Sequence, residues 1–419
     1  MIGTSIKTDK TKRGREHIMR ESGILMPVSS LPGPYGIGCF GKKAEKFVDF
    51  LAAAGQKIWQ ILPLSPTGYG DSPYQSCSAF AGNPYFIDLD ALKAEGLLTA
   101  AQLKAEPWGK DPLNVDYGTL YTSRYKVLRA AYAAWRRQCA GQHGCAHYYP
   151  DAYYAFTLEN EGWLEDYALY MALKTANGMK SWTEWPREYR LRDAAALAKF
   201  AAEQEEEIGF WKFLQYEFAT QWKKVKDYAN AKGVKILGDI PIYVSADSVD
   251  AWVGGELFEL DAQGGFARVA GCPPDYFSAD GQLWGNPLYR WDLMQDTGFQ
   301  WWKERLSGSF ELYDCLRIDH FRGFESYYAI PYGDKTARNG AWQKGPGKAF
   351  VDSIKEPYHC KNFHIVFLCK FFNCSLYYYV RMSKDIFVYF LLLYEISTPE
   401  LIVLLLCLFL IISDFTPCL

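Results

Sequence analysis

The sequence predicts an α/β fold with a parallel sheet, and three observations support this prediction. Short apolar segments alternate with longer segments of helical periodicity. The apolar segments run into loops rich in Gly, Pro and polar residues, as strands do. The length of 419 residues suffices for one large α/β barrel or for two to three smaller domains.

The first strand is expected at residues 22–28 and is followed by a Gly- and Pro-rich loop. Apolar residues then recur at helical spacing over 42–54, and Gly55 is expected to cap this helix. The second strand, 57–62, runs into the loop 63–84. Strand, helix and strand in this order begin a parallel sheet.

Residues 90–218 are mainly helical, and they are too long for an ordinary connection, so we expect an inserted helical subdomain. A helix over 217–232 should return the chain to the sheet at a third strand, 234–244.

Residues 250–287 read as an irregular segment, and we interpret 264–290 as an aromatic lid. A helix over 291–306 leads to the fourth strand, 312–319. In barrels of parallel strands the active site lies at the C-terminal strand ends, where these loops begin.

Composition excludes some functions. The net charge is −3, which gives no electrostatic reason to expect a nucleic-acid partner. Residues 1–20 form a polar extension without the apolar stretch of a signal peptide. No Cys-x-x-Cys pair occurs, so the cysteines are interpreted as reduced thiols in a cytoplasmic protein.

Composition changes sharply after the segment 21–356, because residues 357–419 contain no Gly, Ala, Trp or Gln. A membrane anchor is one explanation, but the apolar run 401–412 is shorter than the ~20 residues that a spanning helix needs. A buried core segment is another, although it would lack the Gly residues that turns use. We favour an unrelated tail, produced by read-through or out-of-frame sequence, and expect no membrane partner.

Asp319 ends the fourth strand and is flanked by Arg317, His320 and Arg322. Nearby cations favour the ionised carboxylate, which can act as a nucleophile. The alternative is a structural ion pair. Asp239 ends the third strand; it could orient the first-strand loop or a sugar, or be an ordinary turn acid.

Aromatic side chains near these strand ends suit a sugar ligand. Tyr74 follows a rigid Gly-Asp-Ser-Pro turn and could stack on a sugar ring, or pack the turn. Tyr276, Phe277 and Trp284 give the lid an aromatic surface that could cover a glucan and exclude water. The Cys and His residues of 139–147 fit no standard zinc spacing, and no metal site is expected.

Six segments together closely resemble the 4-α-glucanotransferases (amylomaltases, or disproportionating enzymes) of glycoside hydrolase family 77, in the α-amylase superfamily. The resemblance covers roughly residues 20–356. The motifs that carry it are Gly23-Ile-Leu-Met-Pro-Val-Ser-Ser-Leu-Pro32, Gly68-Tyr-Gly-Asp-Ser-Pro-Tyr-Gln-Ser76, Ala79-Phe-Ala-Gly-Asn-Pro84, Gly238-Asp-Ile-Pro-Ile-Tyr-Val244, Pro273-Pro-Asp-Tyr-Phe-Ser278 with Trp284-Gly-Asn-Pro287, and Arg317-Ile-Asp-His-Phe-Arg-Gly323.

The resemblance implies a (β/α)8 TIM barrel with inserted helical subdomains. It implies transfer of a 1,4-α-glucan segment to the 4-hydroxyl of an acceptor, with retention and no cofactor. Substrates would be maltodextrin, starch or glycogen-derived glucans. The implied catalytic residues are Asp319 as nucleophile, Arg317, His320 and Asp239. The implied substrate-binding residues are Ser72, Tyr74, Asp275, Tyr276, Phe277, Trp284 and Asn286.

One departure from the family is large. The family's acid/base Glu motif and its third catalytic Asp motif do not occur in this sequence. We therefore expect about the first half of the barrel and a truncated, inactive chain. The alternatives are a non-catalytic glucan-binding fragment and a hydrolytic α-amylase-like enzyme.

Overall fold

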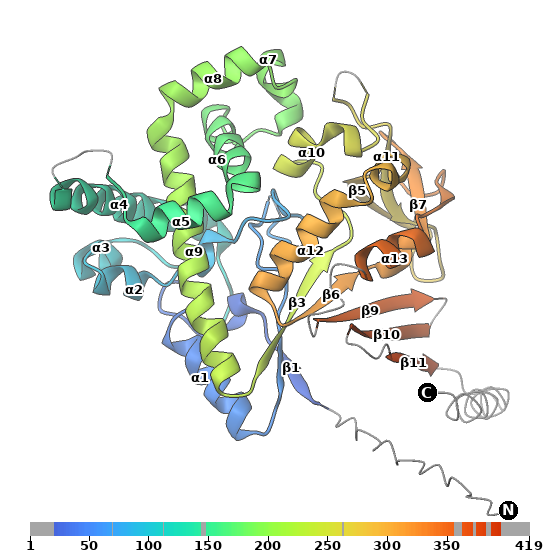
Figure 1. The fold of residues 1–419 in the computed structure, drawn as a ribbon, viewed down its shortest axis with the longest axis horizontal. Coiled ribbons are helices and arrows are strands. Elements are labelled where there is room, and N and C mark those ends of the chain that lie inside the picture. The colour runs from blue at the N-terminus through green and yellow to red at the C-terminus, as the bar shows by residue number, and fades with distance from the viewer. Residues whose placement is uncertain are drawn as a thin grey trace, which may run out of the picture.

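The computed structural model describes residues 21–355, except 69, 112, 144–147 and 262–263, together with three further strands at 363–371, 374–382 and 387–394. The fold is α/β, with a main sheet whose strand order is β1-β2-β3-β6-β9-β10-β11 (Figure 1). In this sheet the neighbouring strands β1, β2, β3, β6 and β9 run parallel to one another. Strands β10 and β11 extend one side of the sheet with antiparallel pairings. The sheet is therefore an open arc of barrel-like topology.

The first βαβ unit follows the sequence prediction. It contains β1 (Gly23–Leu25), α1 (Lys42–Ala53) and β2 (Ile58–Gln60). Helix α1 buries Ala44, Val48 and Leu51, which lie on one helical face. Gly55 has a φ of 71°, and the amide of the next residue donates to the Leu51 carbonyl, so the predicted glycine cap is confirmed.

A helical insert separates β2 from β3. In Figure 1 its helices α4, α5, α6 and α8 gather around α9, on the side away from β9–β11. Its helices are α2 (Leu89–Ala94), α3 (Ala100–Ala105), α4 (Tyr117–His143), α5 (Asp151–Glu159), α6 (Glu161–Ala176), α7 (Arg187–Arg190) and α8 (Ala194–Glu203).

Helix α9 (Glu205–Ala231) joins the insert to the sheet. The return helix begins twelve residues before its predicted start at 217, because residues 205–216, which were predicted to belong to the insert, continue into it without a break. Three glutamates in its first turn suit the positive end of the helix dipole. At 27 residues it is about 40 Å long.

The third and fourth parallel strands are β3 (Lys235–Pro241) and β6 (Cys315–Asp319). Between them lie α10 (Val249–Val253), α11 (Trp291–Asp296) and α12 (Gln300–Leu312). The single helix predicted over 291–306 is two helices, because Gly298 and Phe299 both have left-handed backbone angles, with φ of 63° and 59°.

A second sheet was not foreseen from the sequence. Its strand order is β5-β4-β7-β8, and all its pairings are antiparallel. The segment predicted as irregular thus supplies two strands, and α13 (Lys348–Lys355) follows the sheet. The strands are β4 (Arg268–Cys272), β5 (Gln282–Pro287), β7 (Ser326–Pro331) and β8 (Ala341–Lys344).

Three strands follow α13. They are β9 (Phe363–Phe371), β10 (Cys374–Met382) and β11 (Phe387–Tyr394). Strand β9 pairs in parallel with β6 over residues 315–318, so β6 has a neighbour on each side. The polar extension 1–20 and the apolar run 401–412 lie outside the described residues. Within the described part, no helix combines the length and hydropathy of a membrane span.

Candidate active site

The C-terminal ends of β3 and β6 bring two acids and one arginine together. In the register of the two strands, Asp239 lies opposite Arg317 and Pro241 lies opposite Asp319. The Arg317 guanidinium pairs with the carboxylates of both Asp239 and Asp319. Three of the predicted catalytic residues therefore form one ion-pair cluster at the strand ends.

The two carboxylates of this cluster differ in exposure. The Asp239 side chain is 1% exposed and that of Asp319 is 42% exposed, with the Arg317 side chain between them at 14%. Asp319 is therefore the carboxylate of this pair that a ligand can reach. Asp239 lies behind it and fixes the position of the shared arginine.

Tyr74 completes the cluster from the loop after β2, since its hydroxyl donates a 2.8 Å hydrogen bond to Asp239. The expectation that Asp239 orients the first-strand loop is thus corrected. Strand β2, and not β1, is the neighbour of β3 in the sheet, so the loop after β2 lies within reach. Tyr74 is held by its hydroxyl rather than packed as an ordinary turn residue.

Burial and charge set the protonation of this cluster. Burial raises the pKa of Asp239 to about 6, although Arg317 and the Tyr74 hydrogen bond favour its charged form. Burial and the nearby Asp239 carboxylate raise the pKa of Tyr74, so its hydroxyl remains a donor. Burial disfavours the charged form of Arg317, but Asp239 and Asp319 outweigh it and raise its pKa.

His320 follows Asp319 directly and has a left-handed backbone, with φ of 51°. Its ring lies edge-to-face against Trp284, with ring centroids 4.9 Å apart. Burial lowers the His320 pKa to about 4, so the imidazole is neutral near pH 7 and can both donate and accept hydrogen bonds. A Cβ on Gly323 would lie 2.7 Å from the Ile242 side chain, so glycine lets this turn approach the loop after β3.

Two predicted ligand contacts hold loops together in this structure. Asn286 is 5% exposed; its amide donates to the Val244 carbonyl at 2.7 Å and accepts from Gln75 at 3.1 Å. Asn286 thereby links β5 to the loops after β2 and β3. The Ser72 hydroxyl accepts a 3.3 Å bond from the Tyr74 amide, which stabilises the turn that presents Tyr74.

The predicted lid is a hairpin between β4 and β5. At its tip, the Asp275 carboxylate accepts hydrogen bonds from the amides of Phe277 and Ser278, at 2.9 and 2.8 Å. Tyr276 and Phe277 are 96% and 82% exposed, and their rings meet edge-to-face at 5.5 Å. The turn therefore holds two large apolar surfaces in solvent, apart from the ion-pair cluster.

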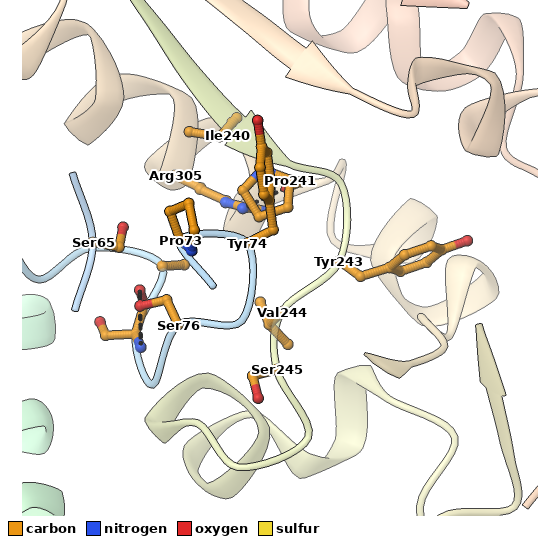
Figure 2. Close-up of a pocket in the computed structure, with 12 residues that line it drawn as sticks. Ser65, Pro73, Tyr74, Ser76, Ile240, Pro241, Tyr243, Val244, Ser245 and Arg305 are labelled. Carbon is orange, nitrogen blue, oxygen red and sulfur yellow. Dashed lines mark hydrogen bonds between the residues drawn. The ribbon is translucent and has the colours of Figure 1, made fainter. Parts of the chain in front are cut away.

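A small pocket lies beside the cluster, between the loops after β2 and β3 (Figure 2). Tyr74 and Pro241 line it on one side, and Val244 and Ser245 line it on the other. At its base the buried Arg305 donates to the carbonyl of Pro241 at 2.6 Å and to that of Ile242 at 3.1 Å. Arg305 thus fixes the backbone just beyond Asp239.

The sequence analysis did not single out Tyr243, Arg305 or Gln75. Tyr243 could have been found, because it belongs to the same motif as Asp239. Its ring lies 6.5 Å from His320 and 6.4 Å from Trp284. Arg305 lies in a helix without a motif, and no sequence signal marks it.

The Cys and His segment 139–147 lies partly outside the described residues, since 144–147 are not described. Among the residues that are described, no three His, Cys, Asp or Glu side chains gather to hold a metal ion.

Comparisons with known proteins identify the family of this chain. The family model described as 4-alpha-glucanotransferase, glycoside hydrolase family 77, matches residues 26–366. The 4-alpha-glucanotransferase of Clostridium butyricum is 49% identical over 79% of this chain and 66% of its own length. That of Thermus thermophilus is 46% identical over 80% of this chain and 65% of its own length. This chain thus spans just under two thirds of these relatives.

A solved structure, the amylomaltase from Streptococcus agalactiae in complex with acarbose, aligns with a TM-score of 0.77 and 44% identity, over 81% of this chain and 67% of that one. The amylomaltase from Corynebacterium glutamicum, at 17% identity and a TM-score of 0.61, shares the fold. The family match, these identities and the cluster at the ends of β3 and β6 lead to one conclusion: the chain belongs to the 4-alpha-glucanotransferases of glycoside hydrolase family 77.

Proposed function

We propose that this chain carries the nucleophile half of a 4-α-glucanotransferase site and binds α-1,4-glucans there. The observation that carries the proposal is the pairing of Asp319 with Arg317 at the end of β6, where Asp319 is open to a ligand and Asp239 is not. The acarbose complex of the related amylomaltase supports an α-glucan ligand. Maltodextrins from starch or glycogen are the proposed substrates.

In the proposed reaction a carboxylate oxygen of Asp319 attacks the anomeric carbon of the donor glucan. The C1–O glycosidic bond breaks, and the leaving oxygen takes a proton from a general acid. The 4-hydroxyl of an acceptor then attacks the glycosyl ester, loses its proton to the same group and frees Asp319. Two inversions give retention. Arg317 holds the Asp319 carboxylate in an ion pair, and neutral His320 is suited to bind a sugar hydroxyl.

The general acid is the missing component. Asp239 cannot serve, because it is 1% exposed and lies behind Arg317. The Glu motif that the family resemblance assigns to this role does not occur in the sequence. Loss of general acid–base catalysis costs about 10²–10⁴ in rate, so we propose that this chain binds glucans with little turnover on its own.

The test measures binding and turnover separately. Purified chain is titrated with maltoheptaose by calorimetry, and is incubated with maltotriose while glucose and longer maltodextrins are followed. We expect binding, weakened by Asp319→Asn or Trp284→Ala, and little disproportionation. Robust formation of a maltodextrin ladder would refute the inactivity, and absence of binding would refute the glucan site.

A purely glucan-binding role is the second candidate, and the lid favours it. Tyr276 and Phe277 are almost fully exposed on a well-formed turn, where stacking on sugar rings needs no catalytic group. Retention on an amylose column that persists in Asp319→Asn and falls in Phe277→Ser would favour this role.

We also propose a cytoplasmic location. Cys39, Cys77, Cys139, Cys272 and Cys315, the cysteines with described side chains, are all free thiols. Free thiols suit a reducing compartment. Fractionation of cells that express the chain tests this proposal.

A further inference from the structure

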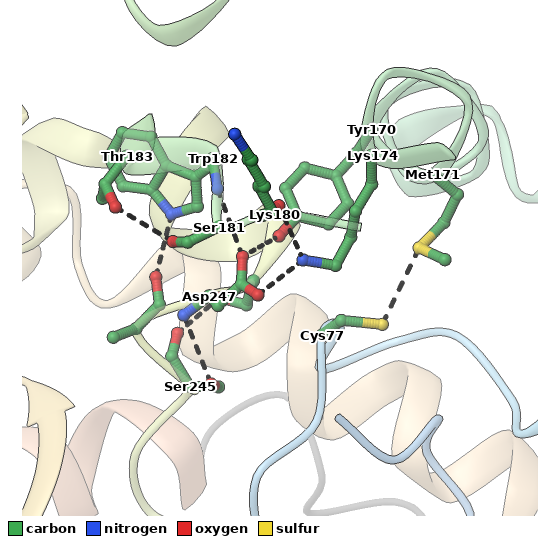
Figure 3. Close-up of polar contacts among 12 residues, drawn as sticks. Cys77, Tyr170, Met171, Lys174, Lys180, Ser181, Trp182, Thr183, Ser245 and Asp247 are labelled. Carbon is green, nitrogen blue, oxygen red and sulfur yellow. Dashed lines mark hydrogen bonds and ion pairs between the residues drawn. The ribbon is translucent and has the colours of Figure 1, made fainter. Parts of the chain in front are cut away.

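The loop after β3, residues 242–248, has two sides with different partners. On its inner side Tyr243, Val244 and Ser245 line the pocket. On its outer side Asp247 faces the helical insert (Figure 3). Contacts made by the outer side of the loop therefore affect the position of the residues that line the pocket.

Asp247 receives three hydrogen bonds from the insert. One carboxylate oxygen accepts from the Tyr170 hydroxyl at 2.8 Å and from the Trp182 amide at 3.3 Å. The other pairs with Lys174 at 2.5 Å. The Lys174 side chain is 8% exposed, so removal of either partner would leave a polar group with little access to water.

The backbone of the loop is bonded to the insert as well. The Trp182 indole donates to the carbonyl of Ala246 at 2.8 Å. Lys174 also donates to the carbonyl of Lys180 at 3.1 Å, which ties the segment after α6 to the same cluster. The loop, α6 and the turn after α6 thus share one partly buried set of hydrogen bonds.

Helix α6 also contacts the loop after β2, whose Ser76 and Ser78 line the pocket. The Met171 sulfur, one residue after Tyr170, lies 3.9 Å from the thiol of Cys77 in the loop after β2. The Cys77 carbonyl accepts a 2.9 Å bond from the Val249 amide, which joins the loop after β2 to the start of α10, directly after the loop after β3. One turn of α6 therefore meets both loops that enclose the pocket.

We propose that Asp247, Lys174 and Tyr170 are positioning residues through which the helical insert holds the loop after β3 in place at the proposed glucan site, where Tyr243 lies near His320 and Trp284. This inference rests on the proposed function. It assigns the insert a role in glucan affinity, although none of the three residues lines the pocket.

The experiment compares the full chain with Lys174→Met and Tyr170→Phe. Lys212→Met is the matched control. Lys212 lies in α9 and pairs with Glu165 of α6, so this change also removes a lysine ion pair on α6 but leaves the bonds to Asp247 intact. Hydrogen–deuterium exchange reports the mobility of residues 241–248, and calorimetry reports the affinity for maltoheptaose. Tyr170→Phe removes one hydrogen bond and no charge, and it carries the test if Lys174→Met does not fold.

We expect faster exchange in the loop and about tenfold weaker glucan binding in Lys174→Met, a smaller effect in Tyr170→Phe, and neither change in Lys212→Met. Lys174→Arg, which keeps the charge, should restore much of the affinity. Loop exchange that rises no more than in the control would overturn the proposal, and so would unchanged affinity in a loosened loop. If the unmodified chain binds no maltoheptaose while the loop still loosens, the glucan site fails and the positioning by the insert stands.

Discussion

The buried carboxyl of Asp239 makes a quantitative prediction about how stability depends on pH. The side chain is 1% exposed, and burial raises its pKa to about 6 from an ordinary value of 3.8. Asp239→Asn keeps the shape of the side chain and removes the group that ionises. The variant therefore isolates the free energy of charging this position.

The sign follows from where the proton is bound. Between pH 3.8 and about 6 the folded chain retains the Asp239 proton and the unfolded chain has lost it. Rising pH therefore favours the unfolded state in this window, and the wild-type chain loses stability. The gap between the two pKa values of Asp239 corresponds to about 3 kcal/mol of unfolding free energy. The wild type loses this stability as the pH rises, and Asp239→Asn does not.

His320 acts in the opposite direction. Its pKa is lowered from 6.5 to about 4, so the unfolded chain binds this proton over the window in which the folded chain does not. Stability from this residue rises with pH. Both proteins contain His320, so its effect cancels when the variant is compared with the wild type at each pH.

The assay is urea unfolding followed by tryptophan fluorescence from about pH 4 to pH 7. The unfolding free energy of Asp239→Asn, minus that of the wild type, should rise by about 2–2.5 kcal/mol over this range. Asp296→Asn, at an exposed aspartate, is the control and should give a nearly flat difference. A flat difference for Asp239→Asn would mean that the ion pair with Arg317 outweighs burial, and it would refute the reasoning.

Three further changes test the packing around the site. Tyr74→Phe deletes a hydrogen bond to the buried Asp239 carboxylate and should lower the unfolding free energy by about 1.5–3 kcal/mol near pH 7, and by less in an Asp239→Asn background. Gly238→Ala would place a Cβ 2.2 Å from the Tyr313 ring and should cost at least about 1–3 kcal/mol in a thermal melt; an unchanged melting temperature would contradict this contact. Phe277→Ser, at an 82% exposed position, should change stability by no more than about 0.5 kcal/mol yet weaken maltoheptaose binding, and equal affinity would remove the lid from the glucan site.

Local patterns were sufficient to predict the elements nearest the site. The apolar spacing of α1, the cap at Gly55 and the acid at the end of β6 are all written within a few residues of sequence. The cluster of Arg317 and Asp319 was predictable for the same reason, since the two residues lie on one face of one strand.

Long-range contacts were not predictable in this way. Strand β4 pairs with β7, some sixty residues away, so the second sheet has no local signal. The same holds for the bonds from Asn286 to Gln75 and from Lys174 to Asp247, which join segments far apart in the chain. Polar side chains in such positions look like surface residues until the partner is known.

The composition and the structure of the segment after residue 356 point in different directions. Its composition predicts a tail unrelated to the preceding chain, and that interpretation stays a prediction. In the structure β9 pairs with β6, and the family match extends to residue 366. The nucleotide sequence around codon 356 would test the composition argument directly, since a splice junction or frameshift is expected there.

Helix α9 has a consequence for how the molecule can move. The Gln215 side chain bonds both the amide and the carbonyl of Gly82, at 2.7 and 3.0 Å, and Gln221 accepts from the Asp88 amide. The chain segment that follows Tyr74 is therefore hydrogen-bonded to α9, the long helix that leads back to β3. A hinge motion between the insert and the sheet would therefore have to bend this helix or break these hydrogen bonds.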